Sequence, residues 1–281
     1  MCKLMNADVV SDLIPQRKSN AYKGDFGRIL LLCGSRGYTG AAALAAMGAL
    51  RTGAGLVYLC VPESIYAIEA VKLTEPIVLP LPDENGMFSV VASEEILSLL
   101  PKMDAVLIGP GIGQSAGTFH AVKTVLEKFC GPVVVDADGI NVLQKHMDIV
   151  RGRTGSTILT PHMGEFARVC EAVDGNRTDL AVDFARKWNC IVLLKGHNTV
   201  ITDGNCYYIN QTGNPGMAVG GSGDLLAGII VSLIGQGLAP LEAAACAAWL
   251  HGAAGDICAK KIGQCGMLPS DMLEVLPRLL K

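Results

Sequence analysis

The segment Gly213–Ile230 reads GNPGMAVGGSGDLLAGII and joins a glycine-rich turn directly to an apolar run. Leu225, Leu226, Ile229 and Ile230 recur at helical spacing, so the glycines are predicted to lie at the N-terminus of a buried helix. The first amides of a helix have no partner within it, and the helix dipole is positive there. The segment therefore predicts an anion site suited to a phosphate group.

The glycines and the acid of this loop predict a catalytic function. Gly220, Gly221 and Gly223 can adopt the positive φ angles of a tight loop and let a phosphate approach the backbone. Asp224 could be only a helix-capping acid. An acid among amides that attract phosphate would repel that phosphate, however, unless it meets a proton or a metal. We therefore predict that Asp224 accepts the proton of a hydroxyl that attacks a phosphoryl group.

The run GNPGMAVGGSGD at 213–224 resembles the anion-hole signature of the ribokinase-like superfamily, specifically of its ADP- or ATP-dependent NAD(P)H-hydrate dehydratases. Further pieces follow in that family's order over nearly the whole chain. They are KGDFG at 23–27, GAAALAAMGALRTGAGLV at 40–57, GPGIG at 109–113, DADGIN at 136–141, TPHMGEF at 160–166 and KGHNT at 195–199. The resemblance implies an α/β fold of the ribokinase-like type, a three-layer α/β/α sandwich, in a single domain over residues 1–281.

Continuous apolar runs predict strands that are buried on both faces, as in a parallel sheet covered by helices. The runs are 28–33, 56–61, 105–108, 132–135, 157–160 and 191–194. Asp203-Gly204 lies between two further short runs and predicts a hairpin. The central sheet is therefore expected to be largely parallel, with an antiparallel ribbon at its edge and long helices at 223–235 and 240–261.

Two further glycine loops follow predicted strands, and open α/β sheets bind ligands at such strand ends. Gly34, Gly37 and Gly40 do not have the spacing of the dinucleotide fingerprint. The resemblance places Ala41, after these glycines, against the nicotinamide substrate, although a small residue there could simply permit close packing. In the second loop, Gly109 and Gly111 are expected to bind the same substrate, with a structural glycine turn as the alternative.

Lys195 ends an apolar strand and precedes a glycine, a position suited to neutralising nucleotide phosphate. A surface lysine is the alternative. We expect the nucleotide to be bound by two segments, one around this lysine and one in the glycine loop. Their residues are Lys195, Gly196, His197, Asn198 and Thr199, and Gly221, Ser222 and Gly223.

Asp136 and Asp138 follow a strand and would lie on one side if the extended backbone continued. They could then hold Mg²⁺ directly or through water, but Asp138-Gly139 is equally typical of a turn and helix cap. No residue is assigned as a direct metal ligand.

The pair Thr160-Pro161 predicts the N-cap and first residue of a helix. His162 and Glu165 would share a face of that helix, without the H-E-x-x-H pattern of a zinc site. The resemblance places His162 against the nicotinamide substrate. The alternative is a solvated histidine at the start of a helix.

For the reaction, the resemblance implies an ADP-dependent (S)-NAD(P)H-hydrate dehydratase that works in metabolite repair with Mg²⁺. ADP, or ATP, would phosphorylate the 6-hydroxyl of hydrated NADH or NADPH, and loss of phosphate would regenerate NAD(P)H. Relatives suggest a homotetramer. Many carry an N-terminal epimerase domain, whereas the dehydratase motifs start close to Met1 here, so we expect epimerase activity on a separate chain.

Two alternatives share the loop. A kinase of the same superfamily, acting on hydroxyethylthiazole or hydroxymethylpyrimidine, would contain GSGD, but TPHMGE together with GNPGMAVGG favours the dehydratase. A non-catalytic adenylate sensor would keep the phosphate site, but Asp224 disfavours it, because phosphate binding alone favours a neutral residue.

Composition excludes several other classes of protein. Lys and Arg number 23 against 26 Asp and Glu, for a net charge of −3, which argues against a nucleic-acid partner. The start of the chain lacks the apolar region of a signal peptide, and the apolar stretch 225–241 is too broken for a membrane span. Ten cysteines without a C-x-x-C pair are typical of reduced thiols, so we expect a cytoplasmic protein.

Overall fold

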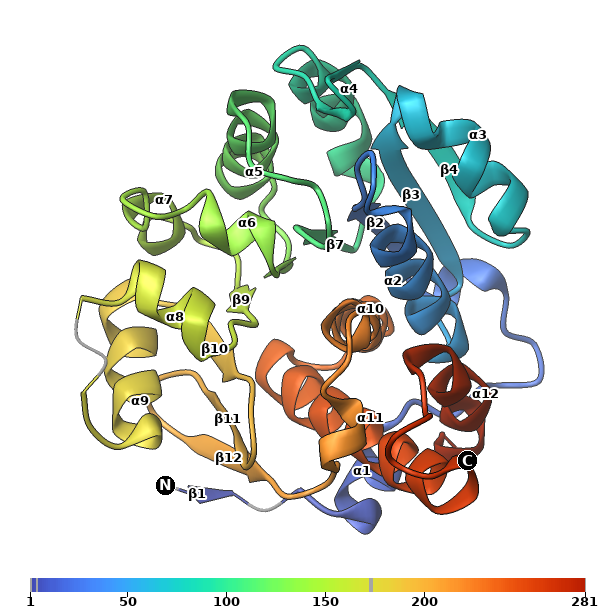
Figure 1. The fold of residues 1–281 in the computed structure, drawn as a ribbon, viewed down its shortest axis with the longest axis vertical. Coiled ribbons are helices and arrows are strands. Elements are labelled where there is room, and N and C mark those ends of the chain that lie inside the picture. Colours follow the sequence, from blue (N-terminus) through green and yellow to red (C-terminus); the bar gives the residue numbers. More distant parts are fainter. Residues whose placement is uncertain (1, 4, 172–173, 281) are drawn as a thin grey trace.

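The fold is built on a ten-stranded sheet in the order β1-β12-β11-β10-β9-β8-β7-β2-β3-β4 (Figure 1). The computed structural model describes residues 2–3, 5–171 and 174–280. The strands are β1 (Cys2–Lys3), β2 (Arg28–Leu32), β3 (Leu56–Pro62), β4 (Ile77–Leu81), β7 (Ala105–Ile108), β8 (Val133–Val135), β9 (Thr157–Leu159), β10 (Ile191–Leu194), β11 (Thr199–Thr202) and β12 (Tyr207–Asn210). Only the β10–β11 and β11–β12 pairings are antiparallel, so the predicted, largely parallel sheet is confirmed.

Helices cover both faces of this sheet. They are α1 (Ala7–Leu13), α2 (Thr39–Arg51), α3 (Glu63–Lys72), α4 (Ala92–Leu99), α5 (Ala116–Lys128), α6 (Asp138–Asn141), α7 (Asp148–Arg151), α8 (Met163–Val169), α9 (Arg177–Trp188), α10 (Ser222–Gly235), α11 (Pro240–Ile262) and α12 (Pro269–Leu279). Along β2, Ile29 and Leu31 face a core formed with α2, α10 and α11, whereas Leu30 and Leu32 face a second core formed with α4, α5, α8 and α9. The predicted three-layer α/β/α sandwich is therefore confirmed.

Helix α10 lies directly against α2, and glycines allow this close approach. A Cβ at Gly228 would lie 2.2 Å from the carbonyl oxygen of Ala45, and one at Gly48 would lie 2.9 Å from that of Leu225. Real Cβ atoms do not approach so closely, so larger residues would separate the helices. The glycine- and alanine-rich composition thus holds the N-terminus of α10 at the carboxyl edge of the sheet.

Some elements differ from the sequence prediction. Strand β4, which contains Pro80, was not predicted; an edge strand tolerates proline because one side needs no hydrogen bonds. The small hairpin of β5 (Asp83–Glu84) and β6 (Met87–Phe88) follows it. Strand β1 pairs in parallel with β12, so it lies outside the predicted edge ribbon. Helix α12 was not predicted.

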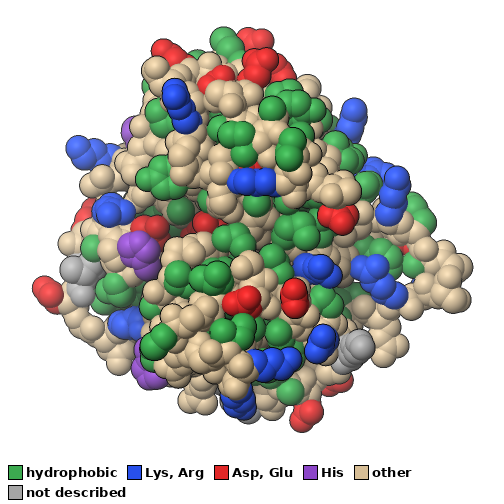
Figure 2. All heavy atoms as spheres, turned by 45° about the vertical axis from the view of Figure 1, so that its right-hand side comes forward, with side chains coloured by type: hydrophobic (Ala, Val, Ile, Leu, Met, Phe, Trp, Pro, Cys, Tyr) green, Lys and Arg blue, Asp and Glu red, His purple; other side chains and the backbone are tan. Residues whose placement is uncertain are grey.

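Charged side chains of one sign do not gather in a large patch on the face shown in Figure 2. Basic and acidic side chains are scattered among one another over the face shown in Figure 2. The cysteines that the structure describes outside β1 form no disulfide bond with one another. Among the described helices, none combines the length and the apolar character needed to span a bilayer.

Candidate active site

The glycine loop leads into α10 as the sequence predicts. Gly221 is the N-cap of the helix with a φ of 93°, a backbone conformation that glycine adopts without strain. Gly220 and Gly223 do not have positive φ angles, so that expectation was wrong for both. The amide of Ser222 donates to Val219 O at 3.3 Å. Within the described part of the chain, the amides of Gly220, Gly221, Gly223 and Asp224 have no protein acceptor.

A buried ion pair lies directly beneath this loop. Lys195 Nζ donates to Asp136 Oδ1 at 2.8 Å and lies 3.8 Å from Glu165 Oε2. Burial alone would lower the pKa of Lys195, but Asp136, Glu165 and Asp224 together raise that pKa above its ordinary value. A Cβ at Gly223 would lie 3.2 Å from Lys195 Nζ. The ammonium is therefore charged and touches the first turn of α10.

Asp224 has the properties of a base that works near neutral pH. The pKa of Asp224 is raised to about 6, chiefly by burial and next by the negative charge of Asp136, while Lys195 opposes the increase. Asp138 and Glu165 add smaller contributions in the raising direction. A carboxyl group with such a pKa can accept a proton more readily than an exposed aspartate.

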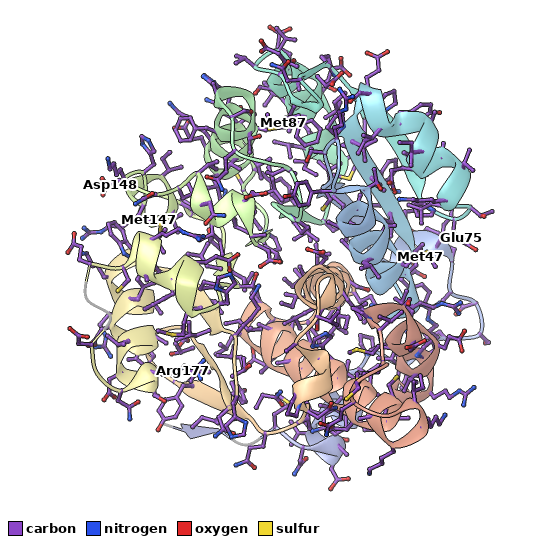
Figure 3. The ribbon with its side chains drawn as sticks, in the orientation of Figure 1. Met47, Glu75, Met87, Met147, Asp148 and Arg177 are labelled. Atoms are coloured by element: carbon purple, nitrogen blue, oxygen red, sulfur yellow. The ribbon has the colours of Figure 1, made fainter. Side chains whose placement is uncertain are left out.

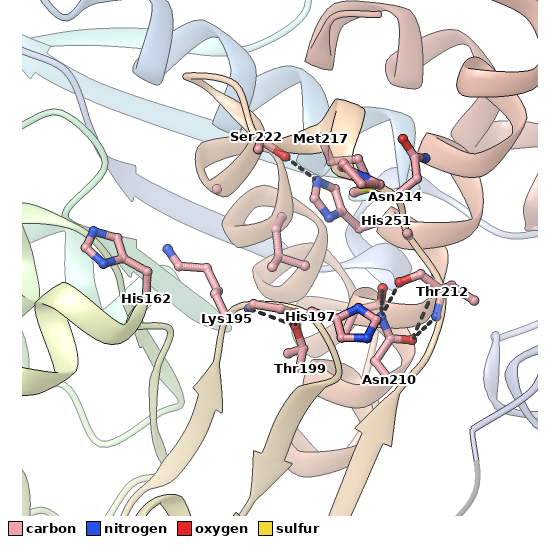
Figure 4. A pocket seen from close by; sticks show the side chains of 18 of the residues that line it. His162, Lys195, His197, Thr199, Asn210, Thr212, Asn214, Met217, Ser222 and His251 are labelled. Atoms are coloured by element: carbon pink, nitrogen blue, oxygen red, sulfur yellow. Dashed lines mark hydrogen bonds between the residues drawn. The ribbon is translucent and has the colours of Figure 1, made fainter. Parts of the chain in front are cut away.

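A cavity of about 960 Å³ opens beside the loop (Figure 4). Its walls come from the ends of β10 and β12, the loop before α10, and α11. Among the residues expected to bind nucleotide, seven line this cavity, and Gly221 does not; the seven are Lys195, Gly196, His197, Asn198, Thr199, Ser222 and Gly223. The structure thus brings together the two segments that the sequence suggested.

His162 also lines this cavity, as the N-cap of α8. Its Nδ1 accepts hydrogen bonds from the amides of Gly164 and Glu165, and its Nε2 lies 3.4 Å from Glu165 Oε1. The prediction that Thr160 caps this helix was wrong, because the Thr160 hydroxyl instead bonds to Asp136 at 2.7 Å. The accepting Nδ1 leaves Nε2 as the protonated nitrogen of the neutral ring.

The three small residues expected at the nicotinamide substrate lie outside this cavity. Gly111 packs against the start of α2, where a Cβ would lie 2.8 Å from that of Ala41. Gly109, with a φ of 132°, packs against the backbone carbonyl of Asp136. Met87 of β6 covers Gly113 of the same loop (Figure 3). These residues form a second loop cluster beside the carboxyl edge of the sheet.

The two carboxylates Asp136 and Asp138 do not act as a pair. Ala137 between them has a φ of 49°, so the extended geometry that would align them ends there. Asp138 instead accepts from the Gly113 amide at 3.0 Å and from Gln114. No cluster of metal-binding side chains occurs in the described ranges. The structure thus gives separate partners to the two acids.

Two residues of this region were not predicted as part of it. His251 of α11 is buried and lines the cavity, with its Nε2 3.3 Å from Ser222 Oγ (Figure 4). Arg177, at the start of α9 (Figure 3), donates to carbonyl oxygens of Leu194, Lys195 and His197. Nothing local in the sequence signals this contact.

The chain is similar to known proteins over nearly its whole length. A bifunctional NAD(P)H-hydrate repair enzyme of Moorella thermoacetica is 43% identical over 99% of this chain. The chain spans about half of that relative, 54% of its length. A ribokinase-like superfamily protein of Enterococcus faecalis has a TM-score of 0.87 at 27% identity, covering 99% of this chain and 95% of that one.

A second solved structure has a more specific description. It is an ADP/ATP-dependent NAD(P)H-hydrate dehydratase of Bacillus subtilis co-crystallised with ATP and Mg²⁺, with a TM-score of 0.84 and 29% identity over 98% of this chain and 96% of that one. The family described as NAD(P)H-hydrate dehydratase matches residues 29–278. The chain, with its ribokinase-like fold, therefore belongs to the NAD(P)H-hydrate dehydratase family.

Proposed function

We propose that this chain dehydrates hydrated NADH and NADPH at the expense of an adenine nucleotide, ADP by preference. One observation carries the proposal: the Asp224 carboxylate, with its pKa raised to about 6, lies in the first turn of α10 beside amides that have no acceptor in the described chain. A base and an anion-binding backbone at one place suit phosphoryl transfer to a hydroxyl. Family membership supports hydrated NAD(P)H as the substrate that carries this hydroxyl.

The reaction has two stages. In the first, Asp224 takes the proton of the 6-hydroxyl, whose oxygen forms a bond to the terminal phosphorus of ADP while the bond from that phosphorus to AMP breaks. In the second, the lone pair of the ring nitrogen expels phosphate from C6, and loss of a proton from C5 restores the dihydropyridine ring. The products are NAD(P)H, AMP and phosphate. Hydroxide is a poor leaving group, so phosphorylation is what makes the elimination feasible.

The two loop clusters would divide the substrates between them. The nucleotide would occupy the cavity of about 960 Å³, with Lys195–Thr199 on one wall and Gly221–Gly223 at its phosphates. The hydrate would lie toward His162 and the cluster of Ala41, Gly109 and Gly111. Asp224 would then act between the two substrates, as a phosphoryl transfer from one to the other requires.

Magnesium would accompany the nucleotide. The described side chains form no cluster that could cage the ion, because Asp136 is bound to Lys195 and Thr160 and Asp138 to the 113–114 loop. Mg²⁺ in nucleotide enzymes is held largely by phosphate oxygens and water, with few protein ligands. We therefore assign no residue as a direct ligand of the Mg²⁺ ion, and we assign no step of the reaction to the ion.

The setting of the enzyme is also a proposal. We propose that residues 1–281 form one dehydratase domain, supported by the single large sheet that β1 and β4 border. A homotetramer is proposed from the family resemblance, and a cytoplasmic location from the cysteines without a C-x-x-C pair, which are typical of reduced thiols.

The test is direct. The protein is incubated with hydrated NADH, Mg²⁺ and either ADP or ATP while the absorbance band of reduced nicotinamide is followed. We expect that band to appear together with equal amounts of AMP and phosphate when ADP is supplied. A stable phosphate ester of hydroxyethylthiazole, without conversion of the hydrate, would instead establish a kinase, and nucleotide binding without any turnover would establish a sensor.

A further inference from the structure

Asp136 is a buried charge at the carboxyl edge of the sheet that the proposed reaction does not use. Its exposed fraction is 1%, and its Oδ1 accepts hydrogen bonds from Thr160 Oγ1 at 2.7 Å and from Lys195 Nζ at 2.8 Å. A carboxylate removed from water is costly unless it is paired and hydrogen-bonded. Both conditions are met here, because Lys195 pairs with Asp136 and Thr160 donates a hydrogen bond to it.

The backbone around Asp136 is fixed as tightly as the side chain. A Cβ at Gly109 would lie 1.8 Å from Asp136 O, so the 109–113 loop closes over this carbonyl only because glycine is present. On the other side, Ala137 has a φ of 49°, a conformation that a residue with a Cβ adopts only under constraint. The main chain that carries this carboxylate is therefore held between two constrained segments.

The second carboxylate oxygen of Asp136 faces the start of α10. A Cβ at Gly223 would lie 3.8 Å from Asp136 Oδ2, closer to it than to any group except Lys195 Nζ. Asp224 is the next residue along the chain. The fixed negative charge thus lies beneath the turn that carries the proposed base.

Other charged and titratable groups face Asp224 from the surrounding elements. They are Lys195 after β10, Asp138 in α6, Glu165 in α8 and the buried thiol of Cys33 after β2. Burial and the nearby carboxylates raise the pKa of Cys33, so this thiol stays neutral. Of the charged neighbours, Asp136 raises the pKa of Asp224 most and Lys195 lowers it. A nearby like charge makes a carboxylate a stronger base.

We propose that Asp136 is a positioning residue for the phosphoryl transfer, which holds a fixed negative charge against Asp224 so that Asp224 can take the hydroxyl proton near neutral pH. Asp136 acts through Asp224 and does not itself bind nucleotide or hydrate. Lys195 and Thr160 keep the charge in place. This inference rests on the proposed function, because it needs Asp224 to be the base.

The test compares the pH dependence of kcat/KM for hydrated NADH in the wild type, Asp136→Asn and Thr160→Val. This parameter reports the ionisation of the free enzyme. The wild type should lose activity as the pH falls through about 6, and this decrease is the acid limb of its pH profile. Asp136→Asn keeps the shape and removes the charge, so this acid limb should move down by about one pH unit. Thr160→Val removes one hydrogen bond to Asp136 but keeps its charge, so the limb should stay in place.

An acid limb that does not move in Asp136→Asn overturns the proposal, and so does an equal movement in both variants, since the charge would then not be the cause. A merely structural role of Asp136 would lower the melting temperature without moving the limb. If the wild type does not convert the hydrate at all, the proposed function fails and this inference fails with it, whereas conversion with an unmoved limb overturns this inference alone.

A second measurement covers the case in which Asp136→Asn does not fold. Infrared difference spectra between pH 7 and pH 5 detect the carboxyl groups that take up protons. The signal of a carboxylic acid that appears near pH 6 in the wild type should be missing in Asp224→Asn, because the proposal assigns this proton uptake to Asp224. Persistence of that signal in Asp224→Asn would show that Asp224 is not the group that takes up this proton and would contradict the proposal.

Discussion

His251 Nε2 lies 3.3 Å from Ser222 Oγ, so a buried side chain of α11 contacts the first residue of α10. Burial lowers the pKa of His251 to about 4; a backbone hydrogen bond with Ser222 opposes the decrease, and Lys195 adds to it. The ring is therefore neutral at physiological pH. Because the imidazole is neutral, the charged groups near the loop are Lys195 and the acidic side chains.

This contact makes the stability of the fold depend on pH. The pKa of His251 is lower in the folded chain than its ordinary value of 6.5, so its contribution to stability is complete above 6.5 and is lost as the pH falls toward 4. The loss amounts to about 3 kcal/mol. His251→Gln should remove this acid-dependent loss, as measured by urea unfolding between pH 7 and pH 4. An unchanged pH dependence would show that His251 is not neutral in the fold.

Asp224 has the opposite effect in the same range of pH. Its pKa rises from 3.8 to about 6 on folding, so the charged carboxylate weakens the fold above pH 6 and protonation strengthens it as the pH falls toward 4. Asp224→Asn should therefore stabilise the fold at pH 7 by up to about 3 kcal/mol. Urea unfolding of this variant also separates its contribution from that of His251. A loss of stability at pH 7 would contradict the proposed cost of this charge.

Arg177 holds the wall of the cavity through backbone carbonyls. Its guanidinium donates to Leu194, Lys195 and His197 at 3.1, 3.0 and 2.7 Å, respectively. A lysine ammonium cannot reproduce this planar set of donors. Arg177→Lys should therefore raise the KM for nucleotide about tenfold, the effect of about 1.4 kcal/mol, with little change in the KM for hydrate.

The matched control for Arg177 is on the same helix. Arg186 also donates to a carbonyl, that of Gly204, which does not line the cavity. Arg186→Lys should leave the KM for nucleotide unchanged. An equal increase in both variants would mean that α9 acts on general stability and not on the nucleotide wall.

Ala137 stores strain next to the site. Its φ of 49° is unfavourable for a residue with a Cβ, typically by about 1–3 kcal/mol. Ala137→Gly should stabilise the fold by about 1 kcal/mol, because relief of strain exceeds the added entropy of the unfolded chain. Ala181→Gly in the middle of α9 should instead destabilise it. Chemical unfolding measures both, and a destabilised Ala137→Gly would show that Ala137 is not strained.

Much of the fold could be predicted because its signals are local. The apolar run before Lys195 marks a strand buried on both faces, and Asp203-Gly204 marks the turn of the β11–β12 ribbon. Strand β4 was missed because its prolines and its exposed side chains, such as that of Ile77, are not typical of a buried strand. Thr160 was misassigned because its hydroxyl has a tertiary partner, which the Thr-Pro pattern does not indicate.

The site was predictable only in part. The glycine loop and Asp224 are contiguous, so their position at a helix N-terminus follows from the sequence. The pairing of Lys195 with Asp136 joins residues 59 positions apart, and no local pattern specifies it. The same holds for Arg177, which acts on carbonyls that any sequence would supply. Long-range pairings of this kind set the electrostatics around Asp224.

The most direct test of the central claim is a single-turnover measurement with hydrated NADH and saturating ADP in the wild type and in Asp224→Asn, alongside the Kd for ADP. If Asp224 accepts the hydroxyl proton, the rate of NADH formation should fall by about 10²–10⁴ while the Kd stays nearly unchanged. A rate in Asp224→Asn close to that of the wild type would show that another group takes the proton and would contradict the account.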